Sequence, residues 1–296
     1  MASRTITSCL KLKLFKKNNS ILNNRTSIFP GSQAFLRQAT TSSVFLDTMV
    51  SRPNHFQFFD KQSQKQDVFL VNFTSPEGKR LFRGAMVQGQ AESFFKLVGN
   101  FSSQSSLTQG GVSSLAMVLN ALEIDPKRIW KGNWRWFSSE QMKTCSSAES
   151  IGEQGIPFDE FTCLAQHYCH VEPYRAQGYQ DFLSRLESVT SNTTNQIVVH
   201  YSRSALGQPD HVAQFSPIGG YNKNEDQVLI MDVARGKYPS VWVKSKDLYN
   251  AMVVKSREEA GRSRGYFILT NKEGEKSTRA AVKLKCKDCT RQCHSK

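Results

Sequence analysis

Residues 110–122 read Gly-Gly-Val-Ser-Ser-Leu-Ala-Met-Val-Leu-Asn-Ala-Leu, and the expected fold is built outward from this stretch. Its apolar residues recur at intervals of three, four and three, at Val112, Leu115, Leu119 and Leu122. Such spacing puts them in one stripe along an α-helix. We therefore expect a helix from near Gly110 to Leu122 that lies buried at the centre of the protein.

Helices are expected in the first half of the chain and strands in the second. Ser75-Pro76-Glu77 is typical of a helix start, and that helix should run to about Lys96. Residues 158–169 predict another helix. The second half holds short β-rich runs between Gly, Pro and Asn turns, at 197–201, 215–221, 228–233, 241–243 and 266–270. Helices followed by strands predict an α+β fold in which a helical N-terminal half packs on an antiparallel sheet.

Length and composition limit the class of protein. The chain has 296 residues, 39% of them hydrophobic, which is enough for a sizeable core. No apolar run approaches the roughly 20 residues that a transmembrane helix needs, so we expect no transmembrane segment. The net charge is +14, from 39 Lys and Arg against 25 Asp and Glu. A basic balance indicates a nucleic-acid partner only where it is concentrated on the folded part.

The positive charge lies instead at the two ends of the chain. Residues 1–46 hold seven basic residues and no acid, and residues 276–296 hold seven basic residues and one acid. The first segment is also rich in Ser, Thr and Asn, which predicts a mitochondrial transit peptide; the alternative is a solvated arm. Because the rest is nearly neutral and holds no nucleic-acid-binding motif, no nucleic-acid function is expected.

The domain organisation follows from these shifts in composition. We expect a targeting segment at 1–46, a linker at 47–69, a folded domain at 70–270 and a basic, Cys-containing tail at 271–296. Within the domain, Trp130, Trp134 and Trp136 alternate with basic residues. These rings have the chemistry to stack on a ligand, but anchoring a loop on the core is the preferred interpretation.

Several ordered blocks closely resemble the phytochelatin synthase family. They are Ser75–Phe82 (SPEGKRLF), Gln104-Ser105, Val118–Leu122 (VLNAL), Trp130–Phe137 (WKGNWRWF), Phe215–Tyr221 (FSPIGGY) and Asp232–Arg235 (DVAR). The resemblance runs from about residue 70 to 270 and implies the fold of papain-like cysteine peptidases. It also implies an acyltransferase, which takes the γ-Glu-Cys unit of glutathione onto a cysteine, releases glycine and passes the acyl group to a second glutathione, typically with cadmium present.

The resemblance assigns four catalytic positions. Gln104 stands at the oxyanion-hole glutamine, and the nucleophilic cysteine, six residues later, is replaced by Gly110. Gln214 stands where the family has its histidine, and Asp232 stands at the aspartate. Glycine has no side chain with which to attack, and glutamine does not exchange protons near neutral pH. We therefore expect thiol catalysis to be lost.

The same resemblance places Arg235 and Tyr238 near the substrate cleft, which allows residual glutathione binding. Alternatively, Asp232 and Arg235 pair structurally, because a triad carboxylate without its histidine needs another partner.

Neighbouring groups are poor substitutes for the missing ones. His211 lies three residues before Gln214, so on an extended strand the two side chains face opposite sides. The hydroxyl groups near Gly110 have no adjacent base; they belong to Ser106, Thr108 and Ser113. Cys145 and Cys163 match other cysteines of the family, and buried packing is their expected role.

Two cysteine groupings have spacings that suit a metal. Cys163 and His167 lie four residues apart, with Cys169 and His170 just beyond them. The tail carries a second grouping, Cys286, Cys289, Cys293 and His294. Cadmium or zinc are the candidate ions, and packed or free thiols are the alternative for both groupings. No cofactor is required.

Three functions remain open at the level of sequence. The leading hypothesis is a structural or accessory subunit of a mitochondrial assembly, whose partners would be the other subunits. The second is an enzyme with residual γ-glutamylcysteine dipeptidyltransferase or glutathione hydrolase activity, in phytochelatin synthesis and heavy-metal detoxification. The third is a sensor that binds glutathione or metal. Fold alone does not choose among them.

Overall fold

The computed structural model describes residues 68–142 and 155–272, which all belong to the unit Ser63–Lys296. The predicted targeting segment at 1–46 and nearly all of the predicted linker and tail lie outside the described residues. Cys145, Cys286, Cys289, Cys293 and His294 lie outside them as well. Within the described ranges, no helix has the length and apolar character to cross a bilayer.

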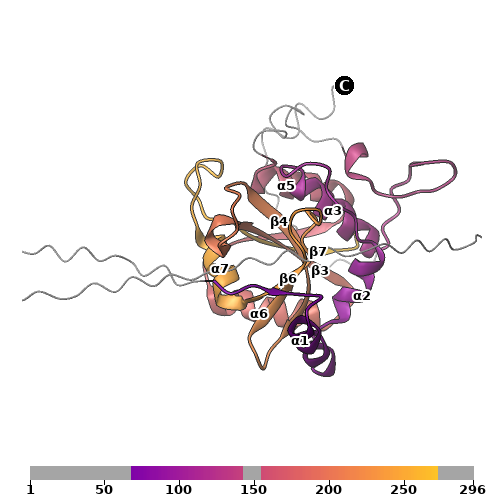
Figure 1. Ribbon diagram of the computed structural model, residues 1–296. Helices are drawn as coiled ribbons and strands as arrows, with labels where there is room; N and C mark the ends of the chain where they lie inside the picture. The colour runs from indigo at the N-terminus through magenta and orange to yellow at the C-terminus, as the bar shows by residue number, and fades with distance from the viewer. Residues whose placement is uncertain (1–67, 143–154, 273–296) are drawn as a thin grey trace, which may run out of the picture. The chain divides into compact units, whose positions relative to one another are not determined.

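A seven-stranded antiparallel sheet forms the centre of the fold (Figure 1). Its spatial order is β1-β6-β5-β4-β3-β7-β2. The bounds are Val71–Asn72 (β1), His170–Arg175 (β2), Asn195–Ser202 (β3), Ala213–Asn222 (β4), Gln227–Ile230 (β5), Val241–Lys244 (β6) and Gly265–Thr270 (β7). All five β-rich runs of the sequence form strands, which confirms the predicted α+β fold with an antiparallel sheet.

Four helices cover one face of the sheet, and they come from the first part of the chain. They are α1 (Pro76–Val87), α2 (Glu92–Gly99), α3 (Gly110–Ala121) and α5 (Phe158–Tyr168). Every residue of α3 is buried, and its apolar side chains join Phe215 and Phe267 of the sheet in one core cluster. The central buried helix predicted from the stripe at Val112 is therefore confirmed.

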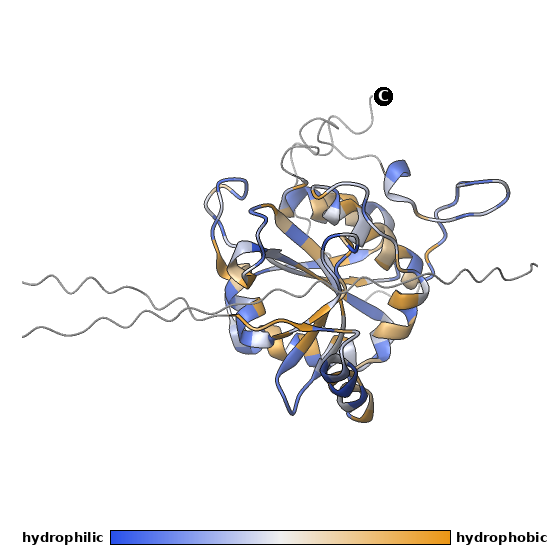
Figure 2. Cartoon of the chain, in the orientation of Figure 1, coloured by the Kyte–Doolittle hydropathy of each residue, from blue (hydrophilic) through white to orange (hydrophobic). Residues whose placement is uncertain are grey.

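Two further helices, α6 (Tyr179–Thr190) and α7 (Ser245–Val253), cover the opposite face. Phe182 and Leu186 of α6 pack there with Leu248 of α7 in a second core cluster. Figure 2 shows apolar residues gathered in the sheet and its flanking helices, whereas the long loops are hydrophilic. The sheet thus lies between two helical layers, and the helices are not confined to the first half of the chain.

The helix that begins at Ser75 is shorter than predicted. Its start is as expected, because the Ser75 hydroxyl accepts a hydrogen bond from the Gly78 amide at 3.0 Å. The helix ends at Val87, and Gly89 then takes a left-handed φ of 65°. Glycine adopts this conformation at little cost. The chain therefore turns at Gly89 and begins a second helix at Glu92, where one continuous helix was predicted.

Strand β2 was not predicted, and Pro173 explains why. Proline has no amide hydrogen, so it argues against an interior strand. Here β2 lies at the edge of the sheet and pairs only with β7, so one side needs no partner. An edge position accommodates proline without loss of a ladder hydrogen bond.

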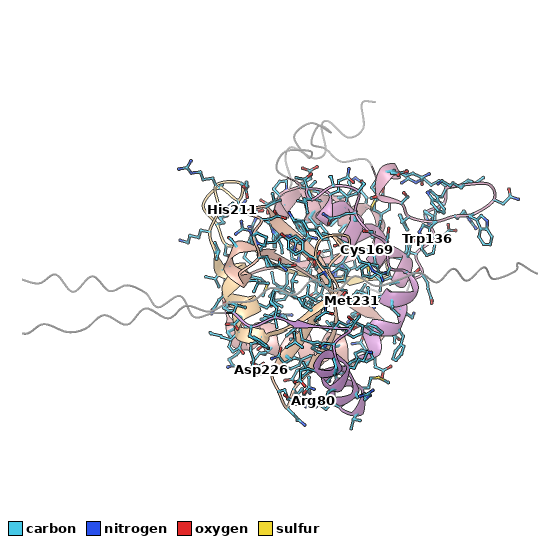
Figure 3. The ribbon with its side chains drawn as sticks, viewed as in Figure 1. Arg80, Trp136, Cys169, His211, Asp226 and Met231 are labelled. Atoms are coloured by element: carbon cyan, nitrogen blue, oxygen red, sulfur yellow. The ribbon has the colours of Figure 1, made fainter. Side chains whose placement is uncertain are left out.

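The tryptophan-rich segment is anchored at Phe137, and Trp134 takes no part in the anchoring. Asn120 of α3 exchanges two hydrogen bonds with the backbone of Phe137, each 2.9 Å long. Phe137 is buried, whereas the side chain of Trp134 is 76% exposed. Trp136 lies on the same projecting loop (Figure 3). The prediction that the tryptophans anchor this loop was wrong for Trp134.

Candidate active site

The N-terminus of α3 meets the beginning of β4 and the segment that follows β5. This junction brings together all four positions singled out in the sequence, Gly110, Gln104, Gln214 and Asp232. They come from four separate parts of the chain. The segment of Gln104 is held in place because its backbone amide donates to the Val233 carbonyl, 2.8 Å away and next to Asp232.

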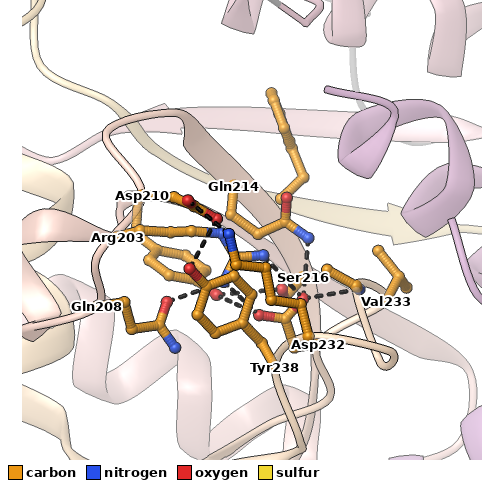
Figure 4. A network of polar contacts seen from close by, with 12 residues as sticks. Arg203, Gln208, Asp210, Gln214, Ser216, Asp232, Val233 and Tyr238 are labelled. Carbon is orange, nitrogen blue, oxygen red and sulfur yellow. Dashed lines mark hydrogen bonds and ion pairs between the residues drawn. The ribbon is translucent and has the colours of Figure 1, made fainter. Parts of the chain in front are cut away.

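The side chain of Gln214 is at the centre of the site. Its Nε2 donates one hydrogen bond to Gln104 Oε1 and another to Asp232 Oδ1, both at 3.0 Å (Figure 4). The amide cannot flip without pointing its oxygen at the Asp232 carboxylate, which only accepts hydrogen bonds. Its Oε1 is therefore directed away from both groups, and this buried atom has no hydrogen-bond partner among the described residues.

Gln214 Oε1 fills the space in which a side chain at Gly110 would begin. A Cβ placed on Gly110 would lie 2.2 Å from that oxygen, well inside contact distance. Glycine is therefore required at position 110 for as long as Gln214 keeps this conformation. Gly110 and Gln214, which the resemblance singled out separately, therefore form one packed unit in the structure.

Gln104 is not free to stabilise an oxyanion as the resemblance implied. Its Nε2 donates to the Ser106 carbonyl at 2.7 Å, and its Oε1 accepts from Gln214. An oxyanion hole needs donors directed at the reacting carbonyl oxygen. Here the amide oxygen and one amide hydrogen are already bonded inside the site.

The buried partner of Asp232 is Arg203. Both guanidinium Nη atoms bind the carboxylate, at 2.6 and 3.0 Å, and both residues are 1% exposed. The hydroxyl of Tyr201 and the backbone amide of Ala234 also donate to it. Burial is the main cause that raises the pKa of Tyr201 above its usual range, followed by the Asp232 charge. The carboxylate is therefore fully satisfied without a histidine.

The expected pair between Asp232 and Arg235 is not formed. Arg235 is exposed, and its guanidinium carbon lies 5.6 Å from the centre of the Phe101 ring. In sequence Arg235 is only three residues from Asp232, but the turn directs it to solvent. Arg203 is separated from Asp232 by 29 residues, and sequence reasoning missed it because no local pattern marks it.

Tyr238 belongs to the same network rather than to an open cleft. Its ring lies 4.0 Å from the Arg203 guanidinium carbon, and its hydroxyl donates to Asp210 at 2.7 Å. Lys237 also binds Asp210, at 2.8 Å. Hydrogen bonds from Lys237 and Tyr238 lower the pKa of Asp210. Of the two expected substrate-binding residues, Arg235 is exposed to solvent and Tyr238 is buried.

None of the neighbouring groups replaces the missing triad members. His211 is exposed on the loop before β4 (Figure 3). Ser106 and Thr108 contact each other at 3.2 Å, and the buried Ser113 hydroxyl has no hydrogen-bond partner in the described part of the chain. A hydroxyl without a base is not an activated nucleophile.

The predicted helical metal site is not assembled. The described ranges hold no group of three or more His, Cys, Asp or Glu side chains placed to bind one ion. His167 Nδ1 instead lies 2.7 Å from the Cys163 carbonyl oxygen. Cys169 is buried, and that burial raises its thiol pKa to about 12. Cys163 and Cys169 are both buried and form no disulfide among the described residues, in agreement with the packing role given as the alternative.

A small cavity opens on the other side of Gly110. Its volume is about 130 Å³, and its polar lining includes His200 of β3 and Glu259 of the loop after α7. Sequence reasoning did not select either residue. The signal available was weak, since a histidine in an apolar strand is compatible with simple packing.

Comparisons with known proteins identify the family of the chain. Residues 62–266 match the family model for phytochelatin synthase. The chain is 44% identical over 203 residues to glutathione gamma-glutamylcysteinyltransferase 3 of Lotus japonicus, covering 68% of this chain and 42% of that protein. It is 39% identical over 223 residues to glutathione gamma-glutamylcysteinyltransferase 1 of Arabidopsis thaliana, with coverages of 74% and 45%.

A fungal relative extends the comparison. The glutathione gamma-glutamylcysteinyltransferase of Schizosaccharomyces pombe is 32% identical over 217 residues, covering 72% of this chain and 51% of that protein. The chain therefore spans about half the length, or less, of these curated relatives.

Proposed function

The chain belongs to the phytochelatin synthase family, and from that membership we propose a member that has lost thiol catalysis and serves as an accessory subunit of a mitochondrial assembly. The relatives are named as transferases of the γ-glutamylcysteinyl group of glutathione. Transfer through a thioester needs a cysteine and a base. Gly110 and Gln214 supply neither group.

One observation carries the loss of catalysis, namely the packing of Gln214 Oε1 against Gly110. With its Nε2 bonded to Gln104 and Asp232, Gln214 completes a site that is closed on itself. Arg203 neutralises the buried carboxylate that would otherwise orient a histidine. The chemistry is absent and the space for the nucleophile is filled.

Glycine release from glutathione tests the loss of catalysis. The full chain should release no glycine above background in the presence of cadmium. A Gly110→Cys, Gln214→His double variant should gain turnover if the substrate cleft persists. The same double variant with Asp232→Asn is the matched control, because the new histidine then lacks its orienting carboxylate. Steady glycine release by the wild type would refute the proposal.

The accessory role rests on two further features. The first 46 residues are basic and free of acids, which supports mitochondrial import, and a protein without catalysis is retained for its surfaces. In gently solubilised mitochondria the chain should migrate with a larger assembly. Migration as a monomer, or absence from mitochondria, would contradict this part of the proposal.

Glutathione binding without turnover is the second candidate, and Arg235 favours it. This exposed guanidinium forms no ion pair with any described residue and suits a carboxylate of the peptide. Calorimetric titration with glutathione should then show binding that Arg235→Ala weakens at least tenfold. The exposed Arg80 already binds Glu77 and Glu225, so Arg80→Ala is the control and should leave binding unchanged.

A further inference from the structure

The cavity beside Gly110 contains polar groups that take no part in the hydrogen bonds around Gln214 and Asp232. Its lining combines Thr108, Gly110 and Gly111 at the start of α3 with Ile156, His200 and Glu259. Its volume of about 130 Å³ is several times the roughly 10–15 Å³ that a single water molecule requires, which leaves room for a small acyl group beside the water.

His200 is a buried base with an unused nitrogen. It is 3% exposed, its ring stacks on Phe215 at 4.0 Å, and its Nδ1 has no hydrogen-bond partner among the described residues. The carboxylate oxygen Oε1 of Glu259 lies 3.8 Å from Nδ1. A carboxylate at this side favours the tautomer with the proton on Nδ1, so the lone pair of the imidazole is on Nε2.

Glu259 is held firmly in its position. It is 2% exposed, accepts the Phe158 amide at 2.8 Å and binds Arg175 at 2.7 Å. Each carboxylate oxygen retains a further lone pair. At 3.8 Å from Nδ1 this carboxylate is beyond hydrogen-bond distance, so it acts on the imidazole through its charge alone.

The start of α3 supplies the third element of such a site. The first amides of a helix have no partner within the helix and carry the positive end of its dipole. Gln109 precedes α3 without capping it through its side chain, and Gly110 and Gly111 border the cavity. Negative charge that develops on a carbonyl oxygen beside these glycines is therefore stabilised.

From this geometry we propose that His200 and Glu259 form a second, cysteine-independent hydrolytic centre that acts on a thioester of a small acid. His200 Nε2 takes a proton from water, and the water oxygen bonds to the thioester carbonyl carbon. The oxyanion forms beside Gly110 and Gly111. When it collapses, the carbon–sulfur bond breaks and the proton passes from Nε2 to the leaving sulfur. One water and one thioester give one acid and one thiol.

The charges around His200 set the class of substrate. Burial, then the charges of Arg264 and Arg175, lowers the pKa of His200 well below 6.5. Glu259 and Glu258 face the same cavity, and Asp159 binds Arg175 on its far side. The imidazole is thus neutral and a weak base, so an activated acyl group is within its reach and an amide is not. This inference uses neither Gln214 nor Asp232 and so does not depend on the transferase chemistry, although Gly110 borders both sites.

The test uses the full chain and S-phenyl thioacetate, with hydrolysis followed by proton release at constant pH. His200→Gln should lower kcat/KM about 100-fold, since general-base catalysis typically contributes that much or more. Ala213→Leu fills the cavity without altering His200 or Glu259 and should lower kcat/KM at least tenfold. His211→Gln, at an exposed histidine, is the matched control and should leave kcat/KM unchanged.

The pH profile separates catalysis from a packing role. Because the neutral imidazole is the active form, the wild-type rate should stay level as pH falls from 7 through 6.5, where an ordinary histidine loses half its activity. No turnover by the wild type, or equal rates for the wild type and a folded His200→Gln variant, would overturn the proposal. Glycine release from glutathione, measured in parallel, reports separately on the lost transferase.

Discussion

Gln214 and Phe215 are consecutive residues of β4, yet the buried ionisable groups on their two sides, Asp232 and His200, differ in how many hydrogen bonds they form. Gln214 pairs with Tyr201 across the strands, and Phe215 pairs with His200. Successive side chains of a strand face opposite ways. On the Gln214 side, Asp232 receives four donor groups and Arg203 fixes its charge. On the Phe215 side, His200 lacks a partner for Nδ1 and borders a cavity.

The difference shows that the two sides of one strand are packed to different degrees. On the Gln214 side, the amide of Gln214 fills the space beside Gly110. On the Phe215 side, the stacked rings of His200 and Phe215 and the glycines at the start of α3 border a cavity.

The largest expected effect is a loss of stability on the Gln214 side of β4, where Arg203 and Asp232 form a buried pair. Arg203→Ala should lower the free energy of unfolding by about 3–5 kcal/mol, because it leaves the Asp232 carboxylate buried without its cation. Chemical denaturation measures the change. Arg80→Ala removes a guanidinium from exposed pairs with Glu77 and Glu225 and should leave the midpoint unchanged. Equal effects of the two variants would contradict the assigned role of the buried pair.

Gly110→Ala tests the packing between α3 and Gln214. The added methyl collides with Oε1 and should destabilise the protein by about 1–3 kcal/mol, the usual cost of overpacking. In a Gln214→Ala background the collision disappears and the cost should fall, which a double-mutant cycle measures. Gly99→Ala is the control, since nothing lies within 4 Å of its added methyl. Strict additivity of the Gly110 and Gln214 changes would disprove the coupling.

The Phe215 side of β4, which contains His200, is tested by the pH dependence of the free energy of unfolding. His200 has a folded pKa well below 6.5, so below that pH the unfolded chain binds more protons than the folded one. The free energy of unfolding therefore falls as pH drops from about 6.5, at no more than about 1.4 kcal/mol per pH unit from this group. His200→Gln should remove this component, and His211→Gln should retain it. If the free energy of unfolding falls with pH at the same slope in wild type and His200→Gln, His200 does not contribute to the pH dependence.

The smallest effect is expected at the solvent-exposed edge of the Gln214 side, where Lys237 and Asp210 form an ion pair. Lys237 binds Asp210 at a half-exposed site, and Asp210 also accepts the Tyr238 hydroxyl. Lys237→Ala should leave the melting temperature within experimental error, because exposed ion pairs contribute little. A clear loss of stability would show that the ion pair of Lys237 and Asp210 supports the buried pair between Arg203 and Asp232.

Elements with a regular apolar period could be predicted from the sequence. The stripe at Val112 identified α3, and short β-rich runs between turn residues identified five strands. Elements with a local exception were missed or misjudged. Pro173 concealed β2, and Gly89 divided a helix that the pattern extended to Lys96.

Helix α6 was missed although a signal was present. Its buried side chains Phe182, Leu186 and Val189 recur at intervals of four and three. The same criterion that identified α3 would have found it.

The sequence indicated which residues make up the candidate site, but not which side chains bond to one another there. The four positions that the family resemblance assigned lie together in the structure, because a shared fold preserves backbone geometry. The partner of Asp232 could not be predicted, since proximity in sequence favoured Arg235 and the structure supplies Arg203 from β3's far end. Side-chain pairing across strands depends on register, which one sequence does not reveal.

The position of β7 has a consequence for biosynthesis. This strand is the last in the described chain, yet it lies between β3 and β2 in the sheet, and β2 pairs with no other strand. While the polypeptide is still being made, β2 and the inner edge of β3 must wait for residues 265–270 to leave the ribosome. Until then Phe267 and Leu269 are missing from the core. A nascent chain halted before Gly265 would expose two unpaired strand edges, a ready substrate for chaperones and proteases.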